Sequence, residues 1–474
     1  MVNTWQGSYR KNYRREASAY HTSHSYGNPE RSGNGSNSSA SGSDIWTAAK
    51  SFASGVWVDL RETGNKLKLG RKHRPDYLLF ILAIGLSTLG LIIVYSIASG
   101  VYDGDTATIN REMAKRILFL IAGIIAFIVA GRIPLEKWKE WAPHLFLFAL
   151  IICAALPILG KIHAPLTYCA LGACRWYMIG SISFQPAELM KLATVLFMAG
   201  YLSTRLSNGK LDDTSTLEEV IIVMVLVLGS VVGLQKDMGT GVALLAIFLL
   251  QLYLSGMSKR RLGFILGLMI VGFILMIIVA PHRMERILTF TKSGNSDTDY
   301  HINQAMIALG SGGLFGRGLG QSVQAFGWLP EAVNDSIFAI IGESLGFVGT
   351  VGLIIAFGVL IFRMLERINY LDNMYLRLIV AGVVGWFTAH VLANTMAMTR
   401  LIPLTGITLP LVSSGGTSLV FVMTALGIVF AVSRYTTHRY VSEDEIMKGA
   451  GQDETNSVRG RRQRRSHYTY SRSN

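Results

Sequence analysis

The sequence contains few of the residue patterns that mark several common kinds of protein. It has only three cysteines in 474 residues, and the spacing of Cys153, Cys169 and Cys174 fits no metal-binding pattern, so no zinc module is predicted. No phosphate-binding loop and no serine–histidine–aspartate arrangement is evident. Residues 1–75 lack the early apolar segment of a secretory signal peptide. We therefore expect the first membrane-spanning segment to direct insertion itself.

What the sequence has instead is a series of apolar runs with few polar interruptions. Half of its residues are hydrophobic, and runs longer than about 17 residues, the length that crosses a bilayer, recur from Tyr77 to Val432. A soluble core would interrupt such runs with polar positions every two or three residues. We therefore expect an all-α, polytopic membrane protein with about ten transmembrane helices. The predicted spans are residues 77–99, 116–133, 143–159, 187–204, 219–235, 240–256, 262–281, 337–362, 376–398 and 415–434.

The formal net charge of +14 does not indicate a nucleic-acid-binding protein. Lys and Arg lie mainly in the two ends of the chain and in short loops between apolar runs, which is the pattern that sets membrane orientation. With both termini inside, 32 of the 44 Lys and Arg residues lie on the cytoplasmic side and 10 on the outer side. The sequence therefore predicts that both termini are cytoplasmic.

This orientation divides the chain into three parts. Residues 1–75 are predicted to be a polar cytoplasmic tail, disordered to about Ser43, with an amphipathic stretch near residues 45–60 that is either an interfacial helix or a linker. Residues 76–436 form the membrane domain, and residues 437–474 a basic, disordered cytoplasmic tail. The large loop between the seventh and eighth spans, about residues 282–336, is expected outside and, because of its length, functional.

Two ionisable residues lie inside a predicted span, where charge is costly and usually marks function. Glu188 and Lys191 are three residues apart, so they share one helix face and can form an ion pair. Two interpretations remain open. The pair either fixes the packing of the helices or lines a polar cavity that opens to the outside.

Asp335 lies where the large external loop meets the eighth span, and that span carries a second acid, Glu343. A partly desolvated carboxylate in this position can act as a general base, although an Asp before a helix can also be an ordinary N-cap. Arg175, next to Trp176 in another external loop, can hold phosphate or serve with the tryptophan as an interface anchor. Cys169 and Cys174 share that external loop, so a local disulfide is possible but not required.

Two further patterns concern metals and irregular backbone. The triplets at residues 103–105 and 297–299 have the Asp-X-Asp form of metal-binding glycosyltransferases, but such triplets often arise by chance in polar loops, and no metal site is predicted from them. Prolines and glycines between residues 403 and 416 predict an irregular approach to the tenth span. Irregular backbone at membrane depth is tolerated where it is buried or lines a wet cavity.

Taken together, these segments resemble the family that includes FtsW, RodA and SpoVE, over roughly residues 77–434. The similar blocks are Arg175-Trp176, Phe184-Gln-Pro-Ala-Glu-Leu-Met-Lys191, Asp237-Met-Gly-Thr240, Asn303-Gln-Ala-Met-Ile-Ala-Leu-Gly-Ser-Gly-Gly313, Gly316-Arg-Gly-Leu-Gly-Gln321, Leu329-Pro-Glu331, Asp335, Ile341-Gly-Glu-Ser-Leu-Gly-Phe-Val-Gly349 and Leu409-Pro-Leu-Val-Ser-Ser-Gly-Gly-Thr-Ser418. Their order among ten spans is more specific than any single block. The chain departs from the family pattern at Val333 and Asn334, where His-Thr is usual, and at Lys236 and Ser414, where Pro and Tyr are common.

The resemblance implies a peptidoglycan glycosyltransferase of the cytoplasmic membrane that polymerises lipid II, with the division (FtsW-like) branch favoured. It implies Asp335 as the catalytic base, and it implies substrate-binding roles for Arg175, Glu188, Lys191, Arg286, Gln304, Glu331 and Ser413. The cofactor is left open, with Mg²⁺ or Mn²⁺ as candidates. The implied partners are lipid II, undecaprenyl-diphosphate-linked glycan, a class B penicillin-binding protein and other division proteins. A lipid II flippase and a non-catalytic scaffold for the penicillin-binding protein are the alternatives.

Overall fold

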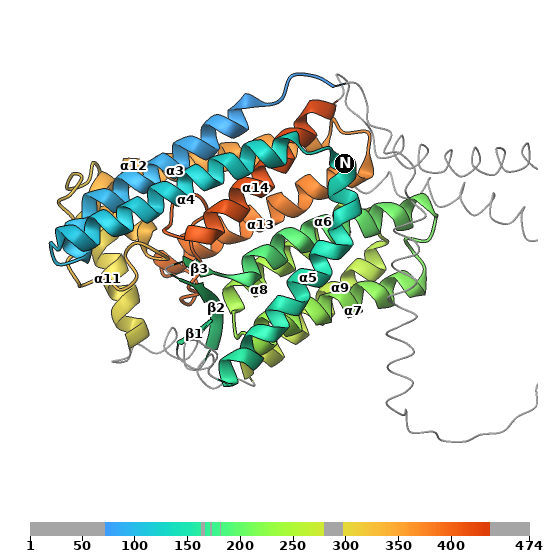
Figure 1. The fold of residues 1–474 in the computed structure, drawn as a ribbon, viewed down its shortest axis with the longest axis horizontal. Coiled ribbons are helices and arrows are strands. Elements are labelled where there is room, and N and C mark those ends of the chain that lie inside the picture. Colours follow the sequence, from blue (N-terminus) through green and yellow to red (C-terminus); the bar gives the residue numbers. More distant parts are fainter. Residues whose placement is uncertain (1–71, 163–165, 171–172, 181, 279–296, 437–474) are drawn as a thin grey trace, which may run out of the picture. The chain divides into compact units, whose positions relative to one another are not determined.

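The computed structural model describes residues 72–162, 166–170, 173–180, 182–278 and 297–436. It confirms the all-α class, and each predicted span coincides with a helix (Figure 1). The helices are α3 (Tyr77–Val101), α4 (Thr106–Arg132), α5 (Leu135–Lys161), α6 (Pro186–Ser207), α7 (Thr214–Leu228), α8 (Met238–Leu254), α9 (Lys259–Ile278), α11 (Asp297–Ser311), α12 (Ile337–Ile368), α13 (Met374–Met398) and α14 (Gly416–Val432). A π-helix, η1 (Gly229–Leu234), continues α7, and a short 3₁₀-helix, η2 (Ser433–Tyr435), continues α14. The amphipathic stretch at 45–60 and the predicted tails, except residues 72–75, lie outside the described residues.

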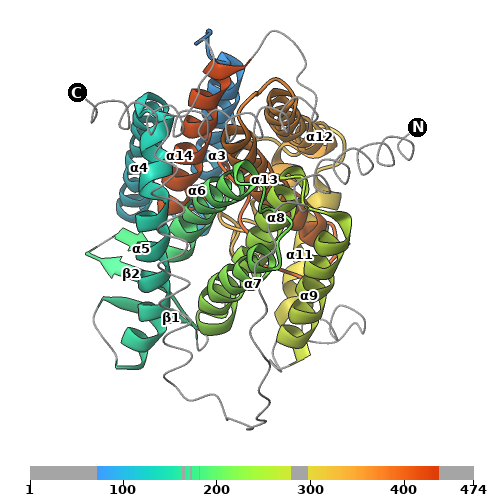
Figure 2. The ribbon, with the colours of Figure 1, turned by 90° about the vertical axis from the view of Figure 1, so that its right-hand side faces the viewer.

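Eight of the described helical segments are long and apolar enough to cross a membrane, and α6 and α8 are not among them. Helix α8 has only 17 residues. Helix α6 is long enough but carries several polar side chains, and nearly all of its residues are buried. It packs against α5, α8, α13 and α14 (Figure 2). Because neighbouring helices shield it on all sides, α6 can be polar where a lipid-facing helix cannot.

The loop between α5 and α6, for which no regular structure was predicted, contains a small antiparallel sheet. Its strands are β1 (Thr167–Ala170), β2 (Ala173–Ile179) and β3 (Ile182–Phe184), in the order β1-β2-β3. The strands are rich in aromatic and β-branched residues, which suit a pleated surface. A disulfide joins Cys169 to Cys174 across β1 and β2, so the local bridge left open by the sequence is present.

The large loop between α9 and α12 is also structured where it is described. Helix α11 occupies its middle, and the glycine-rich stretch after α11 packs against a break in α12. At this break Gly346 has φ +70°, outside the helical range. The amides of Arg317 and Gly318 donate to the carbonyls of Glu343 and Ser344, which satisfies carbonyls that the broken helix leaves open.

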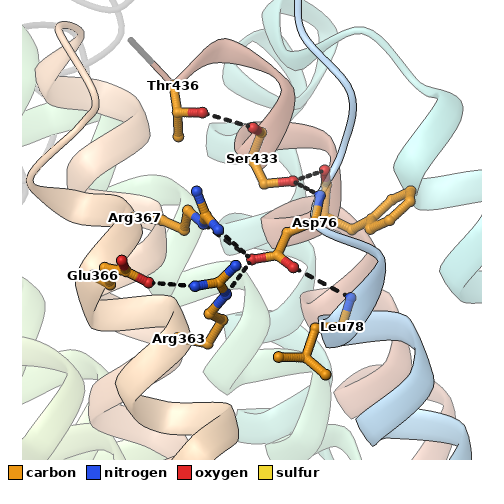
Figure 3. Close-up of polar contacts among 8 residues, drawn as sticks. Asp76, Leu78, Arg363, Glu366, Arg367, Ser433 and Thr436 are labelled. Carbon is orange, nitrogen blue, oxygen red and sulfur yellow. Dashed lines mark hydrogen bonds and ion pairs between the residues drawn. The ribbon is translucent and has the colours of Figure 1, made fainter. Parts of the chain in front are cut away.

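A cluster of polar residues ties the start of α3 to the ends of α12 and α14 (Figure 3). The carboxylate of Asp76 pairs with Arg363 at 2.8 Å and with Arg367 at 2.9 Å. The Asp76 amide donates to the hydroxyl of Ser433 at 3.0 Å. Figure 2 shows this end of the helices opposite the end that carries the sheet.

Candidate functional site

Asp335 lies in the irregular turn that leads into α12, and its side chain is buried, at 7% exposure. The N-cap of α12 is the next residue, Ser336, whose hydroxyl donates to the carbonyl of Pro330. The N-cap interpretation of Asp335 is therefore wrong. What remains is a buried carboxylate at the end of a membrane-spanning helix.

Two side chains from distant segments hold the turn that carries Asp335. The amide nitrogen of Asn394, on α13, donates to the carbonyls of Asp335 and Ile407, both at 2.7 Å. The hydroxyl of Ser413 donates to the carbonyl of Asn334 at 2.7 Å and accepts from the amide of Leu409 at 2.8 Å. These bonds join the Asp335 turn to the segment between α13 and α14, whose irregular backbone was predicted from its prolines and glycines.

The carboxylate of Asp335 faces this irregular segment. A Cβ atom placed on Gly406 would lie 3.9 Å from Oδ2 of Asp335. Three of the five non-glycine residues with positive φ among those described lie in the two segments that frame the carboxylate, namely Glu331, Arg400 and Leu411. Such conformations cost roughly 1–3 kcal/mol each and gather at functional sites.

A second polar network lies deeper, between α6 and α13. Lys191 is fully buried, and its ammonium donates to Glu188 at 2.8 Å, which confirms the predicted ion pair. The same ammonium lies 3.0 Å from Nε2 of His390 and 4.7 Å from the ring centroid of Trp386. His390 Nδ1 lies 3.1 Å from the carbonyl of Thr408. Since that carbonyl can only accept, Nδ1 carries the proton and Nε2 accepts from Lys191.

This network reaches the irregular segment that faces Asp335, because Thr408 adjoins Ile407, which Asn394 binds. Lys191 has no exposed surface. In this structure its ammonium therefore acts through His390 and the backbone of Thr408. The buried pair agrees with the packing interpretation, and through His390 it supports the wall of the candidate site.

Two of the remaining predicted binding residues, Glu331 and Gln304, lie on segments that adjoin this centre. The exposed Glu331 accepts from the side chain of Asn334, in the Asp335 turn. Gln304 is half-buried on α11, and its helix meets the turn where His301 Nε2 lies 2.6 Å from the hydroxyl of Ser336. Glu343 is fully buried and accepts from the hydroxyl of Ser322 and the amide of Val323, so it orders the preceding loop.

Arg175 has a different neighbourhood from the one a phosphate-binding role suggests. Its guanidinium donates to the carbonyl of Lys236 at 2.8 Å and lies 3.5 Å from that of Gln235, at the end of η1. It therefore caps a helix end, using part of its five donors. Nearby, Gln185 donates to Asp237 at 3.0 Å, which links the start of α6 to the start of α8. Arg286 lies outside the described residues.

The described side chains do not form a metal-binding site by themselves. No group of three or more His, Cys, Asp or Glu side chains converges within the described part of the chain. In the triplet at residues 103–105, Asp105 caps α4. The hydroxyl of Thr108 and the amide of Ala107 hold the pKa of Asp105 below its usual value. The triplet at 297–299 begins α11.

His390 and Asn394 connect the two networks, and neither was predicted from the sequence. Both are polar residues inside a predicted span, and their spacing of four places them on one face of α13. That was the available signal, because polar residues within apolar runs are costly unless they find partners. Their partners are backbone carbonyls, which leave no trace in the sequence.

The chain is similar to known proteins over most of its length. The model of the FtsW/RodA/SpoVE family, described as cell cycle proteins, matches residues 76–438. The chain belongs to this family. Stage V sporulation protein E of Bacillus subtilis is 33% identical over 373 residues, which cover 78% of this chain and 99% of that protein. The probable peptidoglycan glycosyltransferase FtsW of Coxiella burnetii is 30% identical and covers 76% and 96%, respectively.

Solved structures share the fold of this family member. A chain of a peptidoglycan synthase complex aligns with a TM-score of 0.61 at 22% identity, over 76% of this chain and 98% of that chain. The rod-shape-determining protein RodA of Thermus thermophilus aligns with a TM-score of 0.56 at 24% identity, over 76% and 98%. The protein is thus a multi-pass membrane protein of this family.

Proposed function

We propose that this protein is a peptidoglycan glycosyltransferase that polymerises lipid II at the outer face of the cytoplasmic membrane. Family membership and the name of the Coxiella relative support the reaction class. The observation that carries the assignment to a site is Asp335. This carboxylate is buried, does not cap its helix, and is positioned by side chains from two other segments.

Asp335 is the general base of the proposed reaction. It takes the proton from the 4-hydroxyl of the acceptor's N-acetylglucosamine while that oxygen attacks the anomeric carbon of the N-acetylmuramic acid at the lipid end of the growing glycan. A new carbon–oxygen bond forms with inversion, and the bond from the anomeric carbon to the phosphate oxygen breaks. The diphosphate leaves with its polyprenyl chain.

The other residues named from the sequence take part in binding or positioning. Glu188, Lys191 and Ser413 position the segments around Asp335, because each uses its polar atoms within the protein. Glu331 and Gln304 are accessible and contact the acceptor. Arg286 offers positive charge to the leaving diphosphate, and Arg175, which caps the end of η1 with part of its guanidinium, offers its remaining donors to the same charge. A divalent cation, if bound, would shield the same charge, with substrate phosphates completing a ligand set that the described side chains alone do not form.

The proposal includes the orientation of the protein in the membrane and its protein partners. The distribution of Lys and Arg supports cytoplasmic termini, so that Asp335 and the sheet face outward. The similarity to a chain of a peptidoglycan synthase complex supports a class B penicillin-binding protein as partner. In cell division, this protein and its transpeptidase partner would act together with other division proteins.

The test is lipid II polymerisation by full-length protein in liposomes with its candidate transpeptidase, with glycan products resolved by size. Asp335→Ala and Asp335→Asn are compared with wild type and with Asp103→Asn, an exposed loop position with φ +49° that Asn tolerates. We expect polymer from wild type and Asp103→Asn and at least a hundredfold less from both Asp335 variants. Polymer from folded Asp335→Ala at the wild-type rate would refute the base assignment. Lipid II movement across the bilayer without polymer from any variant would instead favour a flippase.

A further inference from the structure

A small polar pocket lies where the described part of the chain begins and ends. It is lined by Lys72, residues 131–136, Ala431, Arg434 and Tyr435, and it has a volume of about 130 Å³. We call it the junction pocket. It is far smaller than the sites that hold drug-sized ligands, which start near 300 Å³. Its size suits a phosphate-sized group.

The junction pocket lies at the level where the membrane-spanning helices end. It is bounded by the segment that leads into α3, by the end of α4 and the start of α5, and by the end of α14. Asp335 precedes the start of α12, which has 32 residues, whereas Arg363 and Arg367 lie near its end, beside this pocket's segment. The pocket is therefore separate from the candidate catalytic site and sits at headgroup depth.

The pocket carries an excess of positive charge. Lys72, Arg132 and Arg434 line it, and Glu136 is the one acid among its lining residues. Within the described part of the chain, none of these three cations has an ion-pair partner. Three cations facing one pocket repel one another, so an anion there would relieve the repulsion.

Long-range bonds hold the backbone next to two of these cations, Lys72 and Arg434. The amide of His73 donates to the carbonyl of Arg434 at 2.7 Å. Three residues later Asp76 is held by Ser433, Arg363 and Arg367, as Figure 3 shows. The segment that carries Lys72 is thereby held across the end of α14.

Aromatic rings orient the cations further. The Lys72 ammonium lies 5.8 Å from the ring centroid of Tyr435, and the Arg434 guanidinium lies 5.4 Å from that of Phe430. Such contacts hold a cation at the edge of an apolar surface without neutralising it. The positive wall of the junction pocket is therefore largely formed before any ligand arrives.

We propose that the junction pocket binds the phosphate of an anionic phospholipid headgroup. A basic pocket between helix ends, at headgroup depth, is the usual form of such a site. The lipid source follows from the position of the pocket, since its helices continue into the bilayer on which the headgroups lie. The site is independent of the polymerisation chemistry proposed above.

The test measures lipid bound to full-length protein in neutral detergent by native mass spectrometry, with titrations of phosphatidylglycerol and phosphatidylcholine. The variants are Arg132→Ala and the triple change of Lys72, Arg132 and Arg434 to Ala. The control is a triple change of Lys137, Lys259 and Arg260 to Ala, which removes the same charge from exposed positions outside the pocket.

We expect wild type to prefer phosphatidylglycerol. Arg132→Ala should weaken this binding about fivefold, which corresponds to the ~1 kcal/mol that one basic residue gains near an anionic surface. The pocket triple variant should weaken it roughly a hundredfold, while the control stays within a few-fold of wild type. Thermal unfolding without lipid shows whether the triple variant folds, and Arg132→Ala alters only an exposed side chain.

Three results would overturn the proposal. Equal losses in the pocket and control variants would mean nonspecific attraction. Displacement of the lipid by inorganic phosphate at matched concentration would assign the pocket to free phosphate. Lipid binding that appears only after Glu443, Asp444 and Glu445 are changed to Gln, Asn and Gln would mean that this acidic segment of the chain is the natural occupant.

Discussion

The removal of the Asn394 side chain tests whether the turn that carries Asp335 is held from α13. Asn394 is 1% exposed, and one nitrogen atom of its amide bonds the carbonyls of both Asp335 and Ile407. In Asn394→Ala both carbonyls lose that donor in a site that water cannot readily enter. The turn and the opposite segment are then free to separate.

The magnitude follows from these two bonds. Interhelical hydrogen bonds in membrane proteins contribute about 0.6 kcal/mol on average and up to about 1.7 kcal/mol, so the change should cost roughly 1–3 kcal/mol of unfolding free energy. The effect on polymerisation should be larger. A displacement of about 1 Å in a positioned group can lower a rate a hundredfold, and Asp335 is directly attached to one of the released carbonyls.

The assay compares Asn394→Ala with Thr395→Val on the same helix. The Thr395 hydroxyl bonds only the carbonyls of Val391 and Leu392 in its own helix, so this control should leave both stability and rate near wild type. Polymerisation is measured per folded protein, at saturating and at limiting lipid II, with the folded fraction from thermal unfolding in detergent. If folded Asn394→Ala polymerises at the rate of Thr395→Val, the positioning role is wrong.

Two further changes address the buried network and the helix break. Lys191→Met should lower the free energy of unfolding by about 3–5 kcal/mol, because it leaves the Glu188 carboxylate buried without its cation. Adding Glu188→Gln should restore part of this stability. If chemical unfolding shows an equal loss in the single and double variants, the pair is not coupled. Gly346→Ala should lower the free energy of unfolding by roughly 2–5 kcal/mol, because the backbone there has positive φ and the new Cβ would lie 2.3 Å from the amide nitrogen of Gly316. The control is Gly352→Ala, at a helical glycine with open space around it. Equal thermal midpoints for the two variants would contradict this prediction.

The sequence was sufficient to predict those parts of the structure that a single physical requirement determines. The helices of the membrane domain follow from hydropathy, because a bilayer leaves few alternatives to a helix. The sequence also predicted the span of α6, whose polar side chains are acceptable because other helices surround it, but it was insufficient for the strands after α5, whose pairing depends on tertiary context. The Glu188–Lys191 pair was predictable because both residues lie on one helix face. Its link to His390 was not, since it joins helices almost 200 residues apart.

Bonds to backbone carbonyls, rather than to side chains, also explain why the chain can depart from the family pattern next to Asp335. Val333 and Asn334 replace the usual His-Thr, yet both contribute to the site through their backbone carbonyls. The carbonyl of Val333 accepts from the amide of Ser414, and that of Asn334 accepts from the hydroxyl of Ser413. Because the turn is held by main-chain acceptors, the side chains at these two positions can change without moving Asp335. The Ser413 hydroxyl and the Asn394 amide are donors that the backbone cannot replace, so the site should tolerate substitution at residues 333 and 334 far better than at 394 or 413.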